Sequence, residues 1–299
     1  MLRRTIRTLP APDLAAALGG RCIQPDLIVI EQVIDGSTWD VLPHDLHTYL
    51  QLVYGVGRWW EASLQEKGYR TLHDLVAHAR FGPDAATCLE CLVRRDARAL
   101  KARRAPVDRL VRLFALGELA FLDIETMGLS FGQEIVVIGV LRFGDDGWVL
   151  RQLAILALSC QAPLLQHALL LLDGAEACVT YNGAAFDVPF LRAAMQFHDV
   201  DTGRLDGLFN ADLLYLMRRR YREELPDCRL TTVAAEVLGM RRLDDIPGEL
   251  IPIEYGRFLK SHDPAVLRRI LDHNRDDLLA LRTIAEHAVA AGCLDGGTT

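Results

Sequence analysis

The chain has 299 residues, of which 51% are hydrophobic and 24% are charged, and its formal net charge is −7. This length predicts one large or two smaller domains with packed cores, and the negative charge argues against broad nonspecific binding to nucleic acid, although a local basic patch would still bind it. The apolar runs, such as residues 154–158 and 168–172, are far shorter than the roughly 18 residues needed to span a bilayer, so we expect no membrane contact.

The first 112 residues differ from the rest of the chain and are expected to form a smaller, mainly helical region. Residues 28–34 are rich in Ile and Val and end at an Asp-Gly pair, which predicts a strand followed by a turn. Residues 113–299 are expected to form the larger domain, which carries the acidic motifs described below.

Residues 54–75 contain a Gly-Val-Gly turn, a helical stretch, a further glycine and then Thr71. With its neighbours, roughly residues 50–80, this segment is similar to helix-hairpin-helix modules, in which a glycine turn presents backbone N–H groups to a phosphate at a helix N-terminus. Thr71 would cap the next helix, with Asp74 in its first turn. The alternative is a plain helical hairpin used for packing, because a lone Gly-x-Gly is a weak signal.

Cys88 and Cys91 form a C-x-x-C pair on a predicted helix. A structural zinc site needs four ligands, and neither a second such pair nor a His pair is near in sequence. The seven cysteines are scattered and no signal peptide is evident, which predicts reduced thiols in a cytoplasmic protein.

The Arg-rich stretch between residues 94 and 112 is interpreted as a solvated helix face.

Two carboxylates separated by one residue lie at the end of an apolar stretch that begins at residue 119, and this stretch is typical of a central strand. The period-2 spacing of Asp123 and Glu125 places both side chains on one face of the sheet. Two negative charges at so short a distance repel one another. A hard divalent cation such as Mg²⁺ would offset the repulsion. The alternative for an isolated D-x-E is one salt-bridged Asp and one Glu at a loop edge. Short Gly-containing connections predict that residues 134–143 and 148–156 continue this strand as an antiparallel meander.

A second acidic motif lies at residues 177–191. Residues 177–181 predict a short strand, and Asn182-Gly183 predicts a turn. Phe186 and Phe190 have helical spacing, so Asp187 lies in the first turn of a helix. The alternative is that Asp187 only complements the helix N-terminus.

The next segment, residues 209–222, reads as a strand that passes into a helix. Asp212 is expected to be an N-cap or a supporting acid rather than a metal ligand. The arginines at positions 218–220 and 222 are the better of the two basic runs as candidates for phosphate contacts. A solvated helix face is the alternative for this run also.

A late amphipathic helix carries the third motif, with helical spacing of Leu267, Ile270, Asn274, Leu278 and Leu281. His273 and Asp277 are four residues apart and therefore project from one face. Asp276 lies about 100° round the helix from Asp277, so we interpret it as solvated or paired with Arg275.

Together, D-x-E on a strand, N-x-x-x-F-D at the start of a helix and a ring residue four positions before an Asp resemble the DEDD 3′–5′ exonucleases, the proofreading-type branch of the ribonuclease H-like superfamily. The longer words FLDIET, VTYNGAAFDVPFL, DDIPGELIP and HNRDDLLAL make residues 115–290 similar to the YprB-type ribonuclease H-like domain. The resemblance implies an α/β fold, with a mixed sheet flanked by helices.

The resemblance also implies a site. The metal ligands would be Asp123, Glu125, Asp187 and Asp277, which would hold two Mg²⁺ or Mn²⁺ ions. His273 would orient or deprotonate the attacking water, although related branches carry Tyr at this spacing or His one residue earlier. The expected substrate contacts are Thr126, Asn182, Phe186, Arg218 and Arg219.

The function implied is metal-dependent hydrolysis of single-stranded DNA or RNA from the 3′ end, with release of nucleoside 5′-monophosphates. Nucleic acid is the expected substrate, and a helicase or another repair or processing protein is the expected kind of partner. Two alternatives are a non-catalytic nucleic-acid-binding adaptor and an endonuclease of the ribonuclease H type. An adaptor has no need of four converging acids, whose repulsion costs stability. The choice between DNA and RNA depends on pocket shape around the 2′-OH.

Overall fold

The computed structural model describes residues 10–36, 38, 43–242 and 245–294, so Asp244 of the DDIPGELIP motif lies outside the described residues. The chain divides into two compact units. One is formed by residues 1–37 and 119–284, and the other by residues 38–118 and 285–299. Each unit is described by itself.

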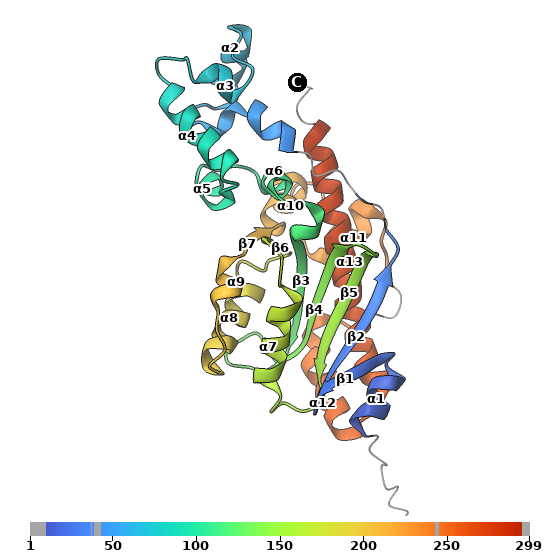
Figure 1. Cartoon of the computed structure of the whole chain (residues 1–299). Coiled ribbons are helices and arrows are strands. Elements are labelled where there is room, and N and C mark those ends of the chain that lie inside the picture. The colour runs from blue at the N-terminus through green and yellow to red at the C-terminus, as the bar shows by residue number, and fades with distance from the viewer. Residues whose placement is uncertain (1–9, 37, 39–42, 243–244, 295–299) are drawn as a thin grey trace, which may run out of the picture. The chain divides into compact units, whose positions relative to one another are not determined.

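The first unit is built on a seven-stranded sheet with the order β1-β2-β5-β4-β3-β6-β7 (Figure 1). The strands are β1 (Gly20–Gln24), β2 (Leu27–Ile34), β3 (Leu119–Thr126), β4 (Ile135–Gly144), β5 (Gly147–Ile155), β6 (Ala177–Thr180) and β7 (Phe209–Asp212). The pairs β3–β4 and β4–β5 are antiparallel, which confirms the predicted meander. The pairs β3–β6 and β6–β7 are parallel, so the sheet is mixed, as expected.

Two strands of this sheet come from the start of the chain. β2 pairs with β5 along its whole length, from Leu27 opposite Ile155 to Ile34 opposite Trp148. The side chains of Ile28 and Ile30 are buried in the core of this unit. The strand at residues 28–34 was predicted. The division of the chain into two units differs from the predicted boundary between residues 112 and 113, because β2 pairs with β5, which is far away in the sequence.

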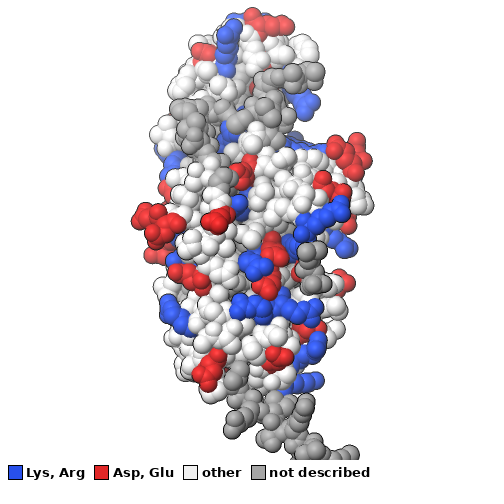
Figure 2. Space-filling view, turned by 90° about the vertical axis from the view of Figure 1, so that its right-hand side faces the viewer, with Lys and Arg blue, Asp and Glu red and all other residues white. Residues whose placement is uncertain are grey.

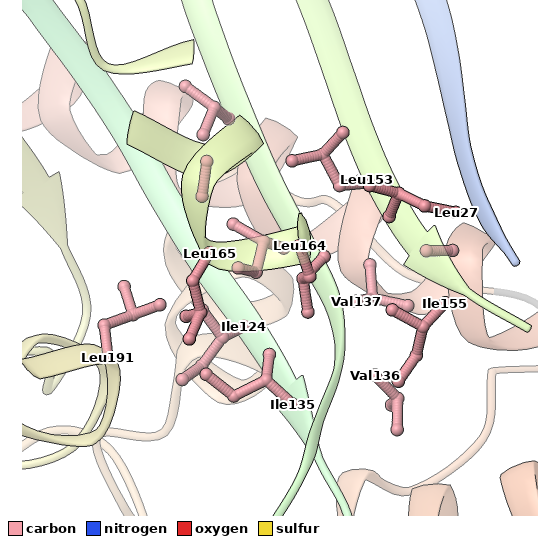
Figure 3. Close-up of a cluster of buried hydrophobic side chains, with 14 of the residues drawn as sticks. Leu27, Ile124, Ile135, Val136, Val137, Leu153, Ile155, Leu164, Leu165 and Leu191 are labelled. Carbon is pink, nitrogen blue, oxygen red and sulfur yellow. The ribbon is translucent and has the colours of Figure 1, made fainter. Parts of the chain in front are cut away.

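Helices cover both faces of the sheet. The first unit contains α1 (Ala11–Ala17), α7 (Gln161–Leu171), α8 (Asp187–Phe197), α9 (Gly203–Gly207), α10 (Leu214–Tyr221), α11 (Leu230–Leu238), the 3-10 turn η5 (Gly248–Leu250), α12 (Ile251–Ser261) and most of α13 (Pro264–Leu294). Leu164 and Leu165 of α7 lie among Ile124, Ile135 and their neighbours on one face of the sheet (Figure 3). Burial of these apolar side chains is the main stabilising contribution to the unit.

Helix α13 packs on the opposite face of the sheet, and Gly139 of β4 allows the helix to approach the sheet closely. Asp123 of β3, Gly139 and Gln152 of β5 form one cross-strand row. A Cβ atom at Gly139 would overlap the Asn274 side chain and lie 2.5 Å from Leu278 Cδ1. The missing side chain therefore lets α13 pack directly on the row that contains Asp123.

The second unit is helical. It contains η1 (Pro43–Thr48), η2 (Leu50–Leu52), α2 (Arg58–Glu66), α3 (Leu72–Leu75), α4 (Gly82–Val93), α5 (Ala97–Ala102), α6 (Val107–Leu110), η3 (Val111–Leu113), η4 (Leu116–Glu118) and the end of α13. Thr71 caps α3 as predicted, and a reciprocal hydrogen bond with Asp74 completes a capping box. Cys88 on α4 is buried, and burial is the main cause that raises the pKa of its thiol to about 11.

The surface shows no single dominant charge on the face in Figure 2, where acidic and basic side chains are interspersed. No helix in the described ranges is both long and apolar enough to cross a membrane.

Candidate active site

The predicted acids meet in one cavity of the first unit, with a volume of about 480 Å³. Its walls include Asp123 and Glu125 from β3, Asp187 from the start of α8, and His273 and Asp277 from α13. Thr126, Asn182 and Phe186, which were expected to contact substrate, also line this cavity. Arg218 and Arg219 line a different hollow in the surface. The structure thus brings together all the predicted site residues except these two arginines.

Strand direction explains why the motifs converge. β3, β6 and β7 run parallel and are neighbours, so their carboxyl ends lie at the same edge of the sheet. Asp212 at the end of β7 accepts hydrogen bonds from the backbone N–H groups of Asn182 (2.9 Å), Ala184 (3.0 Å) and Leu214 (3.0 Å). It therefore ties the turn after β6 to the start of α10, a supporting role of the kind expected for it.

A polar network fixes the first carboxylate. Asn274 Nδ2 donates to Asp123 Oδ2 at 2.7 Å, and Gln152 Nε2 donates to Asn274 Oδ1 at 2.9 Å. Asn274 is fully buried, and these two bonds satisfy both ends of its amide. Asp187 Oδ1 in turn accepts a hydrogen bond from the backbone of Ile124 at 3.2 Å, so helix α8 is joined to the strand that carries Asp123.

The acids are held in an unfavourable environment. Burial is the main cause that raises the pKa of Asp123 well above its usual value, and the charges of Asp277, Glu125 and Asp187 raise it further. Burial also raises the pKa of Glu125 well above its usual value, with additional contributions from Asp277 and Asp187. For Asp187, burial raises the pKa to about 7 despite two backbone hydrogen bonds that lower it. Burial and crowding of these carboxylates therefore favour a bound cation or proton.

The donor atoms fit a hard divalent cation. Glu125 Oε1 is buried and has no hydrogen-bond partner among the described residues. One ligand atom each from Glu125, His273 and Asp277 lies within 4.8 Å of the other two. Carboxylate oxygens are the ligands that Mg²⁺ and Mn²⁺ prefer, and a cation would satisfy the free oxygen of Glu125.

Two residues that the sequence did not single out complete the site. Asp245 Oδ1 lies 2.7 Å from His273 Nδ1. Arg242 donates hydrogen bonds to Asp245, at 3.0 Å, and to Asp277. Both belong to the segment before η5 and α12, and Gly248 and Glu249 of η5 and Pro252 of α12 line the cavity. Asp245 lies inside the DDIPGELIP motif, but its spacing from His273 shows no period that would predict the contact.

Asp276 points away from the cavity, as predicted. Its carboxylate lies 2.9 Å from the guanidinium of Arg275, whereas Asp277 lines the cavity.

The sequence profile of the RNase_H superfamily matches residues 120–289, more than half of the chain. The chain belongs to this superfamily, and the fold and the acidic cavity agree with that membership.

A curated relative is the uncharacterized protein YprB of Bacillus subtilis (strain 168), which is 34% identical over 171 residues. The match covers 56% of this chain and 41% of YprB.

Among solved structures, the family B DNA polymerase of Pyrobaculum calidifontis matches with a TM-score of 0.44 and 19% identity, over 56% of this chain and 24% of the polymerase. A product-bound exonuclease I matches with a TM-score of 0.34 and 17% identity, over 52% of this chain and 46% of that protein. Membership of the superfamily and the acidic cluster are consistent with a nuclease-type domain that uses divalent metal ions. The expected helicase partner finds no support in these comparisons.

Proposed function

We propose that the protein is a 3′–5′ exonuclease that hydrolyses single-stranded DNA or RNA. The observation that carries the proposal is the convergence of Asp123, Glu125, Asp187 and Asp277, together with His273, on one cavity of the superfamily fold. The 3′ polarity is what the resemblance to DEDD exonucleases implies.

In this proposal Asp123, Glu125, Asp187 and Asp277 hold two Mg²⁺ or Mn²⁺ ions. Bound there, the ions lower the pKa of the attacking water and stabilise the charge that builds on the attacking and leaving oxygens. The protein contributes the rigid placement of the ligands. Asn274 fixes the Asp123 carboxylate and the Ile124 amide fixes that of Asp187, and such supporting contacts set ligand orientation.

His273 is proposed to orient the attacking water or to take its proton. Asp245 holds the ring through Nδ1, which leaves Nε2 directed toward the side of the cavity where Asp277 lies. Thr126, Asn182 and Phe186 are proposed to contact the terminal nucleotide. Thr126 already donates its hydroxyl proton to Gly128 O at 2.7 Å, so its contact would use the hydroxyl oxygen as an acceptor.

Cleavage at a strand end is proposed over internal cleavage because the resemblance to DEDD exonucleases implies it. The lining of the cavity includes Gly248, Glu249 and Pro252. A covered pocket would suit the end of a strand, whereas an endonuclease requires a groove that is open at both ends.

The proposal is tested by incubating the purified protein with 3′- and 5′-labelled DNA and RNA strands in Mg²⁺, Mn²⁺ or EDTA. Release of labelled mononucleotide from the 3′-labelled strand at the earliest times, together with a descending ladder from the 5′-labelled strand, is the expected result. Internal fragments at early times would support the endonuclease. Binding without hydrolysis in either metal would support the adaptor. The Asp123→Asn variant is the control for a contaminating nuclease.

A further inference from the structure

A second hollow lies in the surface of the first unit, and we call it the arginine groove. Its volume is about 650 Å³, and its lining includes Tyr215, Arg218 and Arg219 from α10 and Arg222, Pro226 and Cys228 from the loop that follows. The acids proposed to hold metal are not part of its lining.

The groove adjoins the acidic cavity. Tyr181 lines the cavity, and its hydroxyl donates to the carbonyl oxygen of Cys228, which lines the groove, at 2.6 Å. The sheet gives the same order, because β3 carries the acids, β6 leads to Tyr181 and β7 leads into α10. Neighbouring strands are about 4.8 Å apart, so β7 lies roughly 10 Å from β3. The linings of the groove and the cavity are therefore in contact through Tyr181 and Cys228.

The positive charge of the groove is largely uncompensated. Arg218 and Arg219 form no ion pair within the described part of the chain, although the net charge is −7. Arg222 contacts Glu223 at 3.6 Å, but both side chains are exposed, so this pair is weak and screened. The only acid in the lining is Asp227, and its carboxylate lies 3.8 Å from the guanidinium of Arg229, which is outside the lining. Uncompensated guanidinium groups in a concave surface favour phosphate.

The groove also offers a flat apolar surface. Tyr215 is 73% exposed, and Leu225 and Pro226 lie in the same lining. A cationic track combined with an exposed aromatic ring is the combination that binds single-stranded nucleic acid, since the cations hold phosphates and the ring stacks on a base.

We propose that the arginine groove binds the single strand just upstream of the phosphodiester that is cleaved, with Arg218 and Arg219 on phosphates and Tyr215 stacked on a base. The inference rests on the proposed nuclease function and extends it, because it assigns a path for the nucleotides that remain after each cleavage. Chains of one to three nucleotides occupy only the acidic cavity, and longer strands also occupy the groove.

The test measures equilibrium binding by the full-length protein in the Asp123→Asn background with Mg²⁺, so that hydrolysis does not interfere. Fluorescence anisotropy is recorded with 3-nucleotide and 15-nucleotide dT and rU strands and with a 15-bp duplex, over a range of salt concentrations. Each phosphate contact contributes a slope of about −0.7 to log K against log salt for single strands. Arg218→Gln/Arg219→Gln should therefore reduce the slope for the 15-mer by about 1.4 and weaken its binding, and leave the 3-mer unchanged.

Four further variants make the result specific. Arg219→Gln alone should reduce the slope by about 0.7, and the matched control Arg21→Gln should leave it unchanged. Arg21 is an exposed arginine on β1, the opposite edge strand of the sheet. Arg218→Lys/Arg219→Lys should keep the slope because it keeps both charges. Tyr215→Ala should weaken binding on the order of tenfold, without a change of slope, because stacking is not ionic.

The proposal is overturned if the arginine variants behave like Arg21→Gln, if the 3-mer is affected as strongly as the 15-mer, or if the duplex binds more tightly through these arginines than the single strand. The hydrolysis assay of the wild type is independent of these outcomes. Arginine-dependent binding without any hydrolysis would refute the nuclease and keep the groove. Hydrolysis with arginine-independent binding would refute the groove alone.

Discussion

Asp245 and His273 are 28 residues apart in the chain and lie within hydrogen-bonding distance, with 2.7 Å between Asp245 Oδ1 and His273 Nδ1. Burial acts to raise the pKa of Asp245, but the hydrogen bonds and charges of His273 and Arg242 outweigh it, and the net pKa is lowered. An ionised carboxylate only accepts hydrogen bonds, so the Nδ1 atom carries the proton. Nε2, which lies 3.4 Å from Asp277 Oδ2, is then available for a water proton or a cation.

This pairing predicts how two substitutions combine. His273→Ala should lower the hydrolysis rate at saturating metal by about 10²–10⁴-fold, the usual range for a general base, with little change in substrate affinity. Asp245→Asn should lower the rate by about 10–100-fold, as typical of a residue that orients another. The double variant should be no slower than His273→Ala, because Asp245 acts through the ring. Losses that simply multiply would mean that Asp245 acts independently.

A metal titration of the same variants separates the two roles open to Nε2. If the ring takes a proton, the rate of His273→Ala stays low at every Mn²⁺ concentration. If the ring binds the cation, the variant recovers as Mn²⁺ is raised. His273→Tyr should regain part of the rate through orientation alone, since a phenol with a pKa near 10 is a poor base at neutral pH.

Substitution of the buried acids should remove activity and preserve the fold. Asp123→Asn retains an oxygen for the amide of Asn274, and Asp187→Asn retains one for the backbone of Ile124. Each change places a permanently neutral group in a crowded, buried acidic cluster, so the melting temperature in EDTA should hold or rise. In Mg²⁺ the wild type should gain stability that the variants lack. Near-wild-type turnover in either variant would contradict the assignment of these ligands.

The raised pKa of Asp187 also predicts a pH dependence for the metal-free protein. The pKa of this carboxyl is about 7 in the folded state, compared with about 3.9 in an unfolded chain. The folded state therefore binds the extra proton, and its stabilising contribution is complete below pH 4 and is lost as the pH rises through 7. Melting temperatures measured in EDTA between pH 5 and 8 should fall with pH in the wild type and fall less in Asp187→Asn. Equal slopes for the two proteins would contradict the raised pKa.

The two adjacent acids of α13 should differ sharply. Asp277 lines the cavity and bonds Arg242, whereas Asp276 faces Arg275. Asp277→Asn should lower the hydrolysis rate on the order of 10²-fold or more, because loss of a ligand costs more than the 10–100-fold typical of a supporting residue. Asp276→Asn should change the rate little, since Arg275 keeps its contact with Asp272 at 2.7 Å. Similar losses in both variants would show that the phase of the helix is misassigned.

Much of the site could be predicted because its signals are local. Period-2 spacing placed Asp123 and Glu125 on one face of a strand, and both lie in the cavity with Asp187 and Asp277. Helical spacing separated Asp277 from Asp276 in the same way. Each of these inferences needed only a few consecutive residues.

The parts that could not be predicted depend on contacts between distant segments. Nothing near Arg242 or Asp245 indicates that their partners are on α13, because the contacts arise only when the segment before α12 folds back over the site. The sequence around Gly139 indicates only a glycine in a strand. Its role becomes clear in the structure, because α13 occupies the space that a side chain at this position would fill. The placement of Arg218 and Arg219 outside the acidic cavity likewise follows from the position of α10 after an edge strand.

The place of β1 and β2 in the first unit also depends on contacts between segments that are far apart in the sequence. This place leads to a stability prediction. Ile28 on β2 is fully buried in the first unit and lies opposite Ala154 of β5, so Ile28→Ala should lower the free energy of unfolding by about 2–5 kcal/mol. At about 2–4 °C per kcal/mol in a unit of this size, the decrease in melting temperature is easily measured. Val33 on the same strand is 69% exposed, and Val33→Ala is the matched control, with a change within about 0.5 kcal/mol. The Ile28→Ala variant should lose hydrolysis of short strands at the same lowered temperature at which it melts. An Ile28→Ala variant that melts like the control would show that β2 does not stabilise the core of the first unit, and would favour the predicted boundary after residue 112.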